Sequence, residues 1–282
     1  MTAKQKNIWK ARLRAGIQIV FFIFFPSVYT AAFSGVKSVF TQIGAGEKIV
    51  WNSFLMALAG VCIYTMVFGR FFCGFACAFG SLGDAVRALY VKGCRRIRRQ
   101  PVTIPEIWRR RLSFGKYIIL AGIVFLCFQG SYSRFRGASP WDVFSMLHAG
   151  NFRLGDYFTG VILLVVILMG MCVEERFFCR NLCPMGAVFS LLPVLPLFSL
   201  RRDREACVKG CSGCERNCPS DIGLPEIGSY KTPGDCFQCQ KCIRSCPRAN
   251  IRCGIEALKG NEVWFTVVRA GLLLLLLVRL GV

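Results

Sequence analysis

The stretch Cys207-Val-Lys-Gly-Cys211-Ser-Gly-Cys214-Glu-Arg-Asn-Cys218-Pro219 is the first of two cysteine runs around which the chain is organised. The second run is Cys236-Phe-Gln-Cys239-Gln-Lys-Cys242-Ile-Arg-Ser-Cys246-Pro247. Together the runs contain eight of the seventeen cysteines. Three closely spaced cysteines followed by a separate Cys-Pro are typical of segments that bind two [4Fe-4S] clusters. Only the second run has this spacing throughout, because the first places three residues between its first two cysteines instead of two.

The last cysteine of each such run ligates the cluster of the other run, because the three closely spaced thiolates already occupy three iron corners of their own cluster. We therefore expect two sets of ligands. Set 1 consists of Cys207, Cys211, Cys214 and Cys246, and set 2 consists of Cys218, Cys236, Cys239 and Cys242. Two structural zinc sites are an alternative, since paired Cys-x2-Cys units also suit tetrahedral zinc, but zinc does not need the repeated Cys-Pro ending. A disulfide framework is typical of small secreted domains and suits this long apolar chain less well.

The composition indicates a membrane protein. The chain has 282 residues, of which 54% are apolar, and it contains 25 Phe. This exceeds the apolar content of ordinary soluble domains. The formal net charge of +21 comes from Lys and Arg beside apolar segments, where they act as topology signals and contact anionic lipid headgroups. Membrane lipid is therefore the expected partner, and nucleic acid is not.

Four apolar runs are expected to cross the bilayer, which requires about 20 apolar residues for a helix. They are 15–33 with a kink at Pro26, 49–69, 112–129 and 157–173. A fifth apolar stretch, 263–282, is interrupted by Arg269 and Arg279, so it forms either a further span or an interfacial helix.

The distribution of basic residues predicts the orientation. The arm 1–14 and the loop 87–116 together contain fifteen Lys or Arg, whereas the connections 36–48 and 129–156 contain five. We therefore expect the N-terminus in the cytoplasm of a prokaryote, with the chain in its inner membrane. Four crossings return the chain to the cytoplasm, so the two cysteine runs lie there too, in a compartment that keeps thiols reduced.

A second motif occurs twice within the membrane part. Arg70-Phe-Phe-Cys73-Gly-Phe-Ala-Cys77-Ala-Phe-Gly80 recurs as Arg176-Phe-Phe-Cys179-Arg-Asn-Leu-Cys183-Pro-Met-Gly186, with an offset of 106 residues. Each copy follows the second helix of a pair, so two parallel halves can bring four thiols together. Cysteines four residues apart share one helix face. We expect Cys73, Cys77, Cys179 and Cys183 to hold a third iron-sulfur centre, with small interface residues as the alternative; the solitary Cys62, Cys127 and Cys172 fit that alternative better.

These features predict an all-α polytopic membrane bundle of two parallel helix-pair repeats with a small cytoplasmic double [4Fe-4S] ferredoxin-like domain. The expected divisions are a first repeat at 1–100, which ends in an amphipathic helix, a second repeat at 101–200, the ferredoxin-like domain at 201–256 and an apolar helix at 263–282. The single histidine and the lack of a Cys-x-x-Cys-His motif exclude bis-His haem and ordinary haem c attachment.

Two Cys-x3-Cys motifs after membrane spans, joined to a double ferredoxin, resemble the NapH-type membrane ferredoxins. This family includes the quinol dehydrogenase subunit of the periplasmic nitrate reductase system. Its membrane motif usually ends in Cys-Pro, which is present at Cys183-Pro184 but replaced at Cys77-Ala78. The resemblance implies two [4Fe-4S] clusters, quinone as a substrate and electron transfer to a protein redox partner in a respiratory or reductase complex.

Two other functions use the same cofactors. An assembly or metal-reducing maturation factor would pass the electrons to a metal or thiol of another enzyme, and a redox sensor would bind a regulator. The sequence names neither the electron donor nor the final acceptor, so an enzymatic role as a quinol dehydrogenase subunit remains an expectation drawn from the resemblance.

Overall fold

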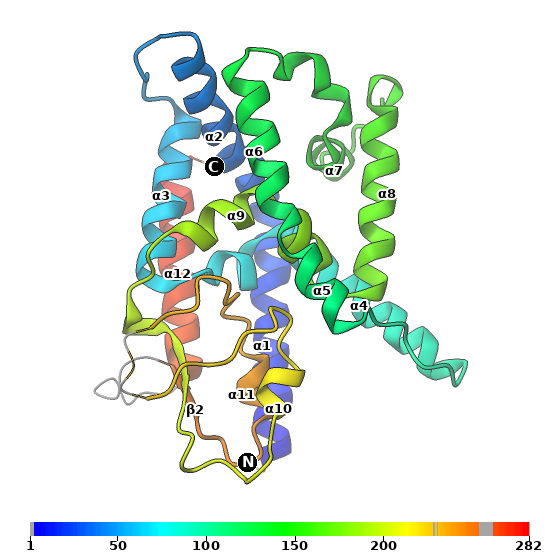
Figure 1. Cartoon of the computed structure of the whole chain (residues 1–282), viewed down its shortest axis with the longest axis vertical. Helices are drawn as coiled ribbons and strands as arrows, with labels where there is room; N and C mark the ends of the chain where they lie inside the picture. The colour runs from blue at the N-terminus through cyan, green and yellow to red at the C-terminus, as the bar shows by residue number, and fades with distance from the viewer. Residues whose placement is uncertain (1–2, 228, 230, 254–261, 282) are drawn as a thin grey trace.

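The computed structural model of the chain describes residues 3–227, 229, 231–253 and 262–281. These residues form a bundle of helices with a small, largely irregular segment at one end (Figure 1). The predominantly helical class agrees with the sequence-based expectation. The last residues of the expected ferredoxin-like domain, 254–256, and Val282 of the expected C-terminal helix lie outside the described residues.

The first apolar run is divided between two helices, α1 (Ala3–Phe24) and α2 (Val28–Gly44). The break is at Pro26, and the two axes differ in direction by 62°. Proline lacks the backbone N–H that a helix interior needs and disfavours helical geometry in the residue before it, so α1 ends before the ring. The expected kink at Pro26 is therefore a sharp break, and the pair is either one broken span or a re-entrant element.

Three stretches of the described chain are long and apolar enough to cross a membrane, and the bent α1–α2 pair raises the number to four. Of the three, 106–128 comprises α5 (Glu106–Leu112) and α6 (Gly115–Phe128), and 155–173 contains α8 (Phe158–Val173). Helix α3 (Ser53–Phe68), predicted over 49–69, is apolar but has only 16 residues. It starts late because the Asn52 side chain caps it by accepting a hydrogen bond from the Leu55 N–H.

The C-terminal helix α12 (Glu262–Leu280) is the third of these stretches. It lies beside α3 (Figure 1), and the Tyr64 hydroxyl donates a 2.8 Å hydrogen bond to the Arg269 carbonyl. The Arg269 side chain is 1% exposed, and its guanidinium carbon lies 4.7 Å from the centre of the Phe71 ring. The arginine that interrupts this apolar stretch is thus buried against an aromatic ring of the first membrane motif.

Each copy of the membrane motif contains a short π-helix and continues into an α-helix. Helix η1 (Phe72–Ala76) leads into α4 (Ala78–Arg96), and η4 (Phe178–Leu182) leads into α9 (Pro184–Leu191). The predicted amphipathic helix is the first part of α4, whose apolar face packs against α8. The remaining helical elements of the bundle are η2 (Tyr132–Ala138), α7 (Pro140–His148), η3 (Gly155–Tyr157) and η5 (Pro196–Phe198).

The ferredoxin-like segment is closed by two short antiparallel strands, β1 (Leu200–Arg202) and β2 (Ile251–Cys253). Between them lie the single-turn helices α10 (Gly213–Arg216) and α11 (Lys241–Ser245). The segment lies at the same end of the molecule as the N-terminus (Figure 1). It has a small apolar cluster of its own, but Phe237 and Cys239 belong to the large core of the membrane helices, so the two parts pack as one body.

Candidate functional site

The two cysteines of each membrane motif are separated by a π-helical turn. The backbone N–H of Cys77 donates to the Phe72 carbonyl and that of Cys183 to the Phe178 carbonyl, both at 2.9 Å across five residues. The second cysteine is also the N-cap of the helix that follows. The α-helical spacing of these cysteines that the sequence predicts is incorrect here, because π turns change the direction of the side chains. Single π turns occur frequently at functional sites.

The four motif thiols are buried, with exposures between 4% and 6%. Each one interacts electrostatically with the other three, so the two halves bring them together in one place. The Cys183 thiol also faces the hydroxyl oxygen of Tyr29, at 3.7 Å. We call Cys73, Cys77, Cys179 and Cys183 the membrane thiols.

The arginine that opens each motif reaches across to the other motif. Arg176 donates through Nη2 to the Gly74 carbonyl at 3.0 Å and through Nη1 to the Cys73 carbonyl. A Cβ atom at Gly80 would lie 2.4 Å from Arg176 Nη1, whereas one at Gly186 would lie 3.0 Å from Arg70 Nη2. The arginine and the glycine of the repeated motif are therefore a crossed pair: each glycine leaves room for the arginine of the other half.

Arg176 is held by a partly buried carboxylate, Asp84 of α4. Its Nε and Nη2 donate to the two carboxylate oxygens at 2.9 and 2.6 Å, which is a bidentate pair. Arg14 and Gln18 of α1 also donate to Asp84, at 2.6 and 2.8 Å. Burial acts to raise the pKa of Asp84, but the guanidinium groups of Arg176 and Arg14 outweigh it and hold the pKa well below its ordinary value. The carboxylate therefore stays charged and fixes both arginines.

Arg70 is bonded much less completely. Its Nη1 donates to the carboxylate of Asp235 at 3.1 Å, and Lys116 also pairs with that carboxylate. Arg70 is 1% exposed, yet its Nε and Nη2 have no hydrogen-bond partner among the described residues. The guanidinium interacts electrostatically with Cys73 and Cys183. Unbonded buried N–H donors beside thiols are suited to an anionic sulfur centre, because sulfur atoms of a cluster accept such hydrogen bonds.

The set 2 cysteines are gathered in the ferredoxin-like segment. Cys242 interacts electrostatically with Cys218, Cys236 and Cys239, so the structure brings the fourth cysteine of the first run to the three close cysteines of the second. The thiols line a small cavity together with Cys214 of set 1. Burial raises the pKa of Cys236 to about 12. This thiol is therefore protonated at neutral pH, and a metal centre must displace its proton.

Two of the set 1 cysteines are linked by an asparagine that was not predicted from the sequence. Asn250 donates through Nδ2 to the Cys207 sulfur at 3.2 Å, and its Oδ1 accepts from the Cys246 thiol at 2.6 Å. The first cysteine of one run and the last of the other thus meet at one amide. Cys214 faces Arg202 Nη1 at 3.7 Å, and Cys211 is exposed. The only sequence signal for Asn250 is its position four residues after Cys246.

No three His, Cys, Asp or Glu side chains within the described part of the chain are close enough to hold one metal ion. A cluster imposes a different requirement, because each of its four thiolates binds a different iron atom. Three groups of thiols fit that requirement in residue type and grouping. They are the four thiols of set 2, the two set 1 thiols that contact Asn250, and the membrane thiols. Arg70 also places two N–H donors, which have no hydrogen-bond partner among the described residues, beside the membrane thiols.

Comparison with known proteins supports iron-sulfur binding. A family model described as a 4Fe-4S binding domain matches the chain twice, at residues 50–96 and 157–202, and each match contains one Cys-x3-Cys motif. An uncharacterized protein of Methanocaldococcus jannaschii is 26% identical over 84% of this chain and 84% of its own length. No solved structure matches the chain.

Two relatives have informative names. The putative electron transport protein YccM of Escherichia coli is 28% identical over 70% of this chain and 54% of its own length. The ferredoxin-type protein NapH of Haemophilus influenzae is 25% identical over 66% of this chain and 62% of its own length. Together with the repeated motif and the two cysteine runs, these matches confirm the resemblance drawn from the sequence: the chain is similar to ferredoxin-type membrane proteins of the NapH type.

Proposed function

We propose that the chain is a membrane-anchored iron-sulfur protein that transfers electrons between the quinone pool and a protein redox partner. Set 1 and set 2 each hold one [4Fe-4S] cluster, and the membrane thiols hold a third iron-sulfur centre. Such clusters supply one-electron oxidation and reduction over a wide range of potentials. The chain's own residues position these centres, keep water from them and balance their charge.

The observation that carries this proposal is the position of Phe237, which lies in set 2 between Cys236 and Cys239. Its ring is 2% exposed, and the guanidinium carbons of Arg70 and Arg176 lie 4.8 and 5.8 Å from the ring centre. Its carbonyl oxygen is so close to Gly74 that a Cβ atom there would lie 2.2 Å away. The loop of set 2 is thus packed directly against the first membrane motif.

The two arginines lie next to both groups of thiols. Arg70 interacts electrostatically with Cys73 of the membrane motif and with Cys236 of set 2. Arg176 does the same with Cys179 and Cys239. Two buried cations that face both groups offset the negative charge of thiolate-bound iron and favour the reduced state. Phe237 keeps water from the space between them.

The arrangement also supports the expected orientation. The N-terminus and the ferredoxin-like segment lie at one end of the bundle (Figure 1), and the sequence has its excess of basic connections at that end. By the positive-inside rule this end is cytoplasmic. Because Cys211 is exposed, a docked protein partner approaches set 1 most easily.

Reduction of the clusters by quinol in proteoliposomes tests this function. A respiratory electron carrier gives quinol-dependent bleaching of the iron-sulfur absorbance, and the bleaching is reversed by an oxidised quinone. If quinol never reduces the clusters while dithionite does, the electron-transfer route to the quinone pool is wrong. A maturation factor or a redox sensor would then be the better description.

A second test uses the expected crossed ligation, in which the last cysteine of each run binds the cluster of the other run. Cys246→Ser should remove the signal of the set 1 cluster and leave the set 2 cluster intact in anaerobically purified protein. Cys253→Ser is the matched control, because Cys253 is buried in the same segment but belongs to neither set. Loss of the set 2 signal in Cys246→Ser would show that the assignment of the cysteines is incorrect.

A further inference from the structure

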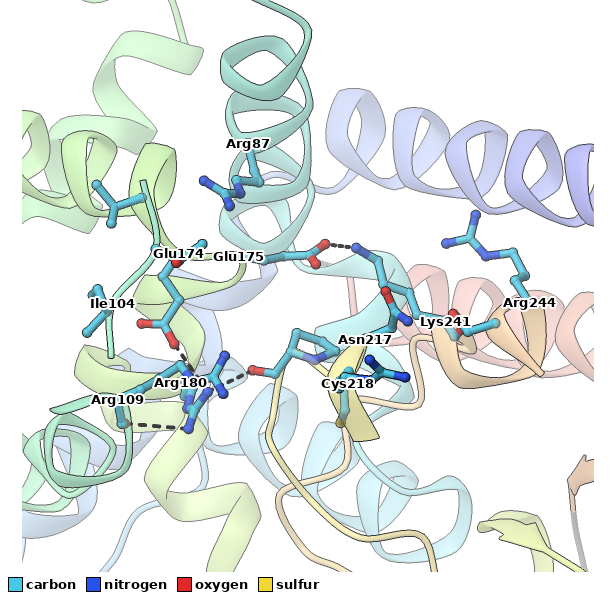
Figure 2. Close-up of a pocket in the computed structure, with 15 residues that line it drawn as sticks. Arg87, Ile104, Arg109, Glu174, Glu175, Arg180, Asn217, Cys218, Lys241 and Arg244 are labelled. Atoms are coloured by element: carbon cyan, nitrogen blue, oxygen red, sulfur yellow. Dashed lines mark hydrogen bonds and ion pairs between the residues drawn. The ribbon is translucent and has the colours of Figure 1, made fainter. Parts of the chain in front are cut away.

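A polar cleft of about 370 Å³ lies where helix α8 meets the ferredoxin-like segment (Figure 2). This volume is in the range of small-molecule sites. Its wall comes from α4, the loop before α5, the end of α8, η4 and the two cysteine runs. The neighbouring set 2 cysteine Cys218 is among the lining residues.

The cleft carries an excess of positive charge. Six cationic side chains line it, Arg87, Arg109, Arg180, Arg216, Lys241 and Arg244, against the two carboxylates of Glu174 and Glu175. Asp221, behind the wall, adds a third negative charge by pairing with Arg109 and Arg180. Three positive charges therefore remain uncompensated.

The carboxylates of the cleft are already occupied. Figure 2 shows Glu174 bonded to Arg180, at 3.1 Å, and Glu175 bonded to Lys241. The guanidinium groups of Arg216 and Arg244, in contrast, have no ion-pair partner among the described residues. Cations that line a cleft without counter-charges favour an anion, and arginine binds phosphate oxygens in a bidentate manner.

The position of the cleft indicates where the anion comes from. Val173, the last residue of α8, lines it, and Arg87 donates to the carbonyl of Cys172 in the last turn of the same helix. The cleft therefore begins where a candidate membrane span ends, which is the level of lipid headgroups. Basic pockets at this level on the cytoplasmic side bind acidic phospholipids.

We propose that this cleft binds the phosphate group of an anionic phospholipid, held by Arg216 and Arg244 next to the ferredoxin-like segment. The proposal goes beyond electron transfer and is independent of it, because it rests on charge and position and not on the thiols. A bound headgroup would join the end of α8 to the two cysteine runs and compensate the excess charge.

Native mass spectrometry of the full chain from nanodiscs of phosphatidylcholine with added phosphatidylglycerol tests this site. The wild type should retain one phosphatidylglycerol, and Arg216→Gln with Arg244→Gln should weaken its retention by about tenfold or more. Lys209→Gln with Arg252→Gln is the control, because it removes the same charge from exposed positions outside the cleft. Equal retention by all three proteins would overturn the proposal.

Two further arms complete the test. Inorganic phosphate titrated in a neutral detergent distinguishes a free anion from a lipid: protection of the wild type against unfolding, absent in the double variant, would assign the cleft to free phosphate and overturn the lipid assignment. If the double variant does not fold, Arg216→Gln alone provides the comparison, because Arg216 is exposed. Retention unchanged by that substitution would then count against the site.

Discussion

The two copies of the membrane motif place their arginines in equivalent positions but use them differently. Arg176 has every donor nitrogen engaged, with Asp84 and with the carbonyls of Cys73 and Gly74. Arg70 is equally buried but leaves Nε and Nη2 unbonded, and its one carboxylate partner, Asp235, is 44% exposed. All donor nitrogens of Arg176 thus stabilise the fold, whereas Arg70 keeps two donors unbonded beside the thiols.

This difference indicates that the two arginines have different roles. A buried cation that is fully paired holds its surroundings in place, whereas buried donors without partners are costly unless a ligand accepts from them. We therefore expect substitution of Arg176 to affect mainly stability and substitution of Arg70 to affect mainly the metal centre. The predictions below are ordered from the largest expected effect on stability to the smallest.

Arg176→Met should destabilise the protein by about 3–5 kcal/mol, because it removes the buried member of the bidentate pair and leaves the partly buried Asp84 with Arg14 as its remaining charged partner. The measurement is the free energy of unfolding in detergent. A loss below about 1 kcal/mol would mean that the network around Asp84 does not hold the two halves together.

Gly80→Ala should destabilise more than Gly186→Ala. The new methyl group would lie 2.4 Å from Arg176 Nη1 in the first case and 3.0 Å from Arg70 Nη2 in the second. Arg176 is fixed by its bonds and cannot move away, so we expect about 2–3 kcal/mol for Gly80→Ala and about 1 kcal/mol for Gly186→Ala. The same unfolding assay measures both, and the reverse order would contradict the asymmetry between the arginines.

Arg70→Met should cost about 1–2 kcal/mol, less than Arg176→Met, because Asp235 keeps Lys116 as a partner and is open to water. Its main effect should be on the membrane centre. Removal of a buried positive charge lowers the reduction potential of a neighbouring iron-sulfur site. Electrochemical titration followed by electron paramagnetic resonance detects this shift, and an unchanged potential would show that Arg70 does not face the centre.

Acid should weaken the Asp84 network only well below neutral pH. The folded-state pKa of Asp84 lies well below its ordinary value of 3.8, because Arg176 and Arg14 outweigh the effect of burial. The carboxylate therefore contributes its stability at every pH above that ordinary value, and the contribution declines as the pH falls below it. In pH-dependent unfolding, Asp84→Asn should be less stable than the wild type at neutral pH, and the difference should shrink in acid. A constant difference would contradict this assignment.

Much of this arrangement was predictable from local patterns. Apolar runs indicated the helices α8 and α12 to within a few residues, and the repeated motif indicated that Cys73 and Cys179 occupy equivalent positions. Pro26 was expected to kink the first span, and it breaks the helix there instead of bending it. The composition alone did not predict the 62° change of direction between α1 and α2.

The partners of the motif arginines were not predictable in this way. Asp84 and Arg14 are 70 residues apart, and Phe237 meets Arg70 from the other end of the chain. Which residues contact these arginines depends on how distant segments pack. The only local signal is weak: a charged residue within or beside an apolar run. Asn250 carries even less signal, since an asparagine after a Cys-Pro also suits an ordinary turn.

The most direct test of the central claim is the iron content of anaerobically purified Cys179→Ala with Cys183→Ala. If the membrane thiols hold a [4Fe-4S] centre, this variant should lose about four iron atoms per chain while the spectra of both ferredoxin clusters persist. Cys127→Ala with Cys172→Ala removes two solitary cysteines of the membrane helices and should lose none. Unchanged iron in the first variant, with unchanged quinol-driven reduction, would contradict the claim and leave the membrane thiols as packing residues.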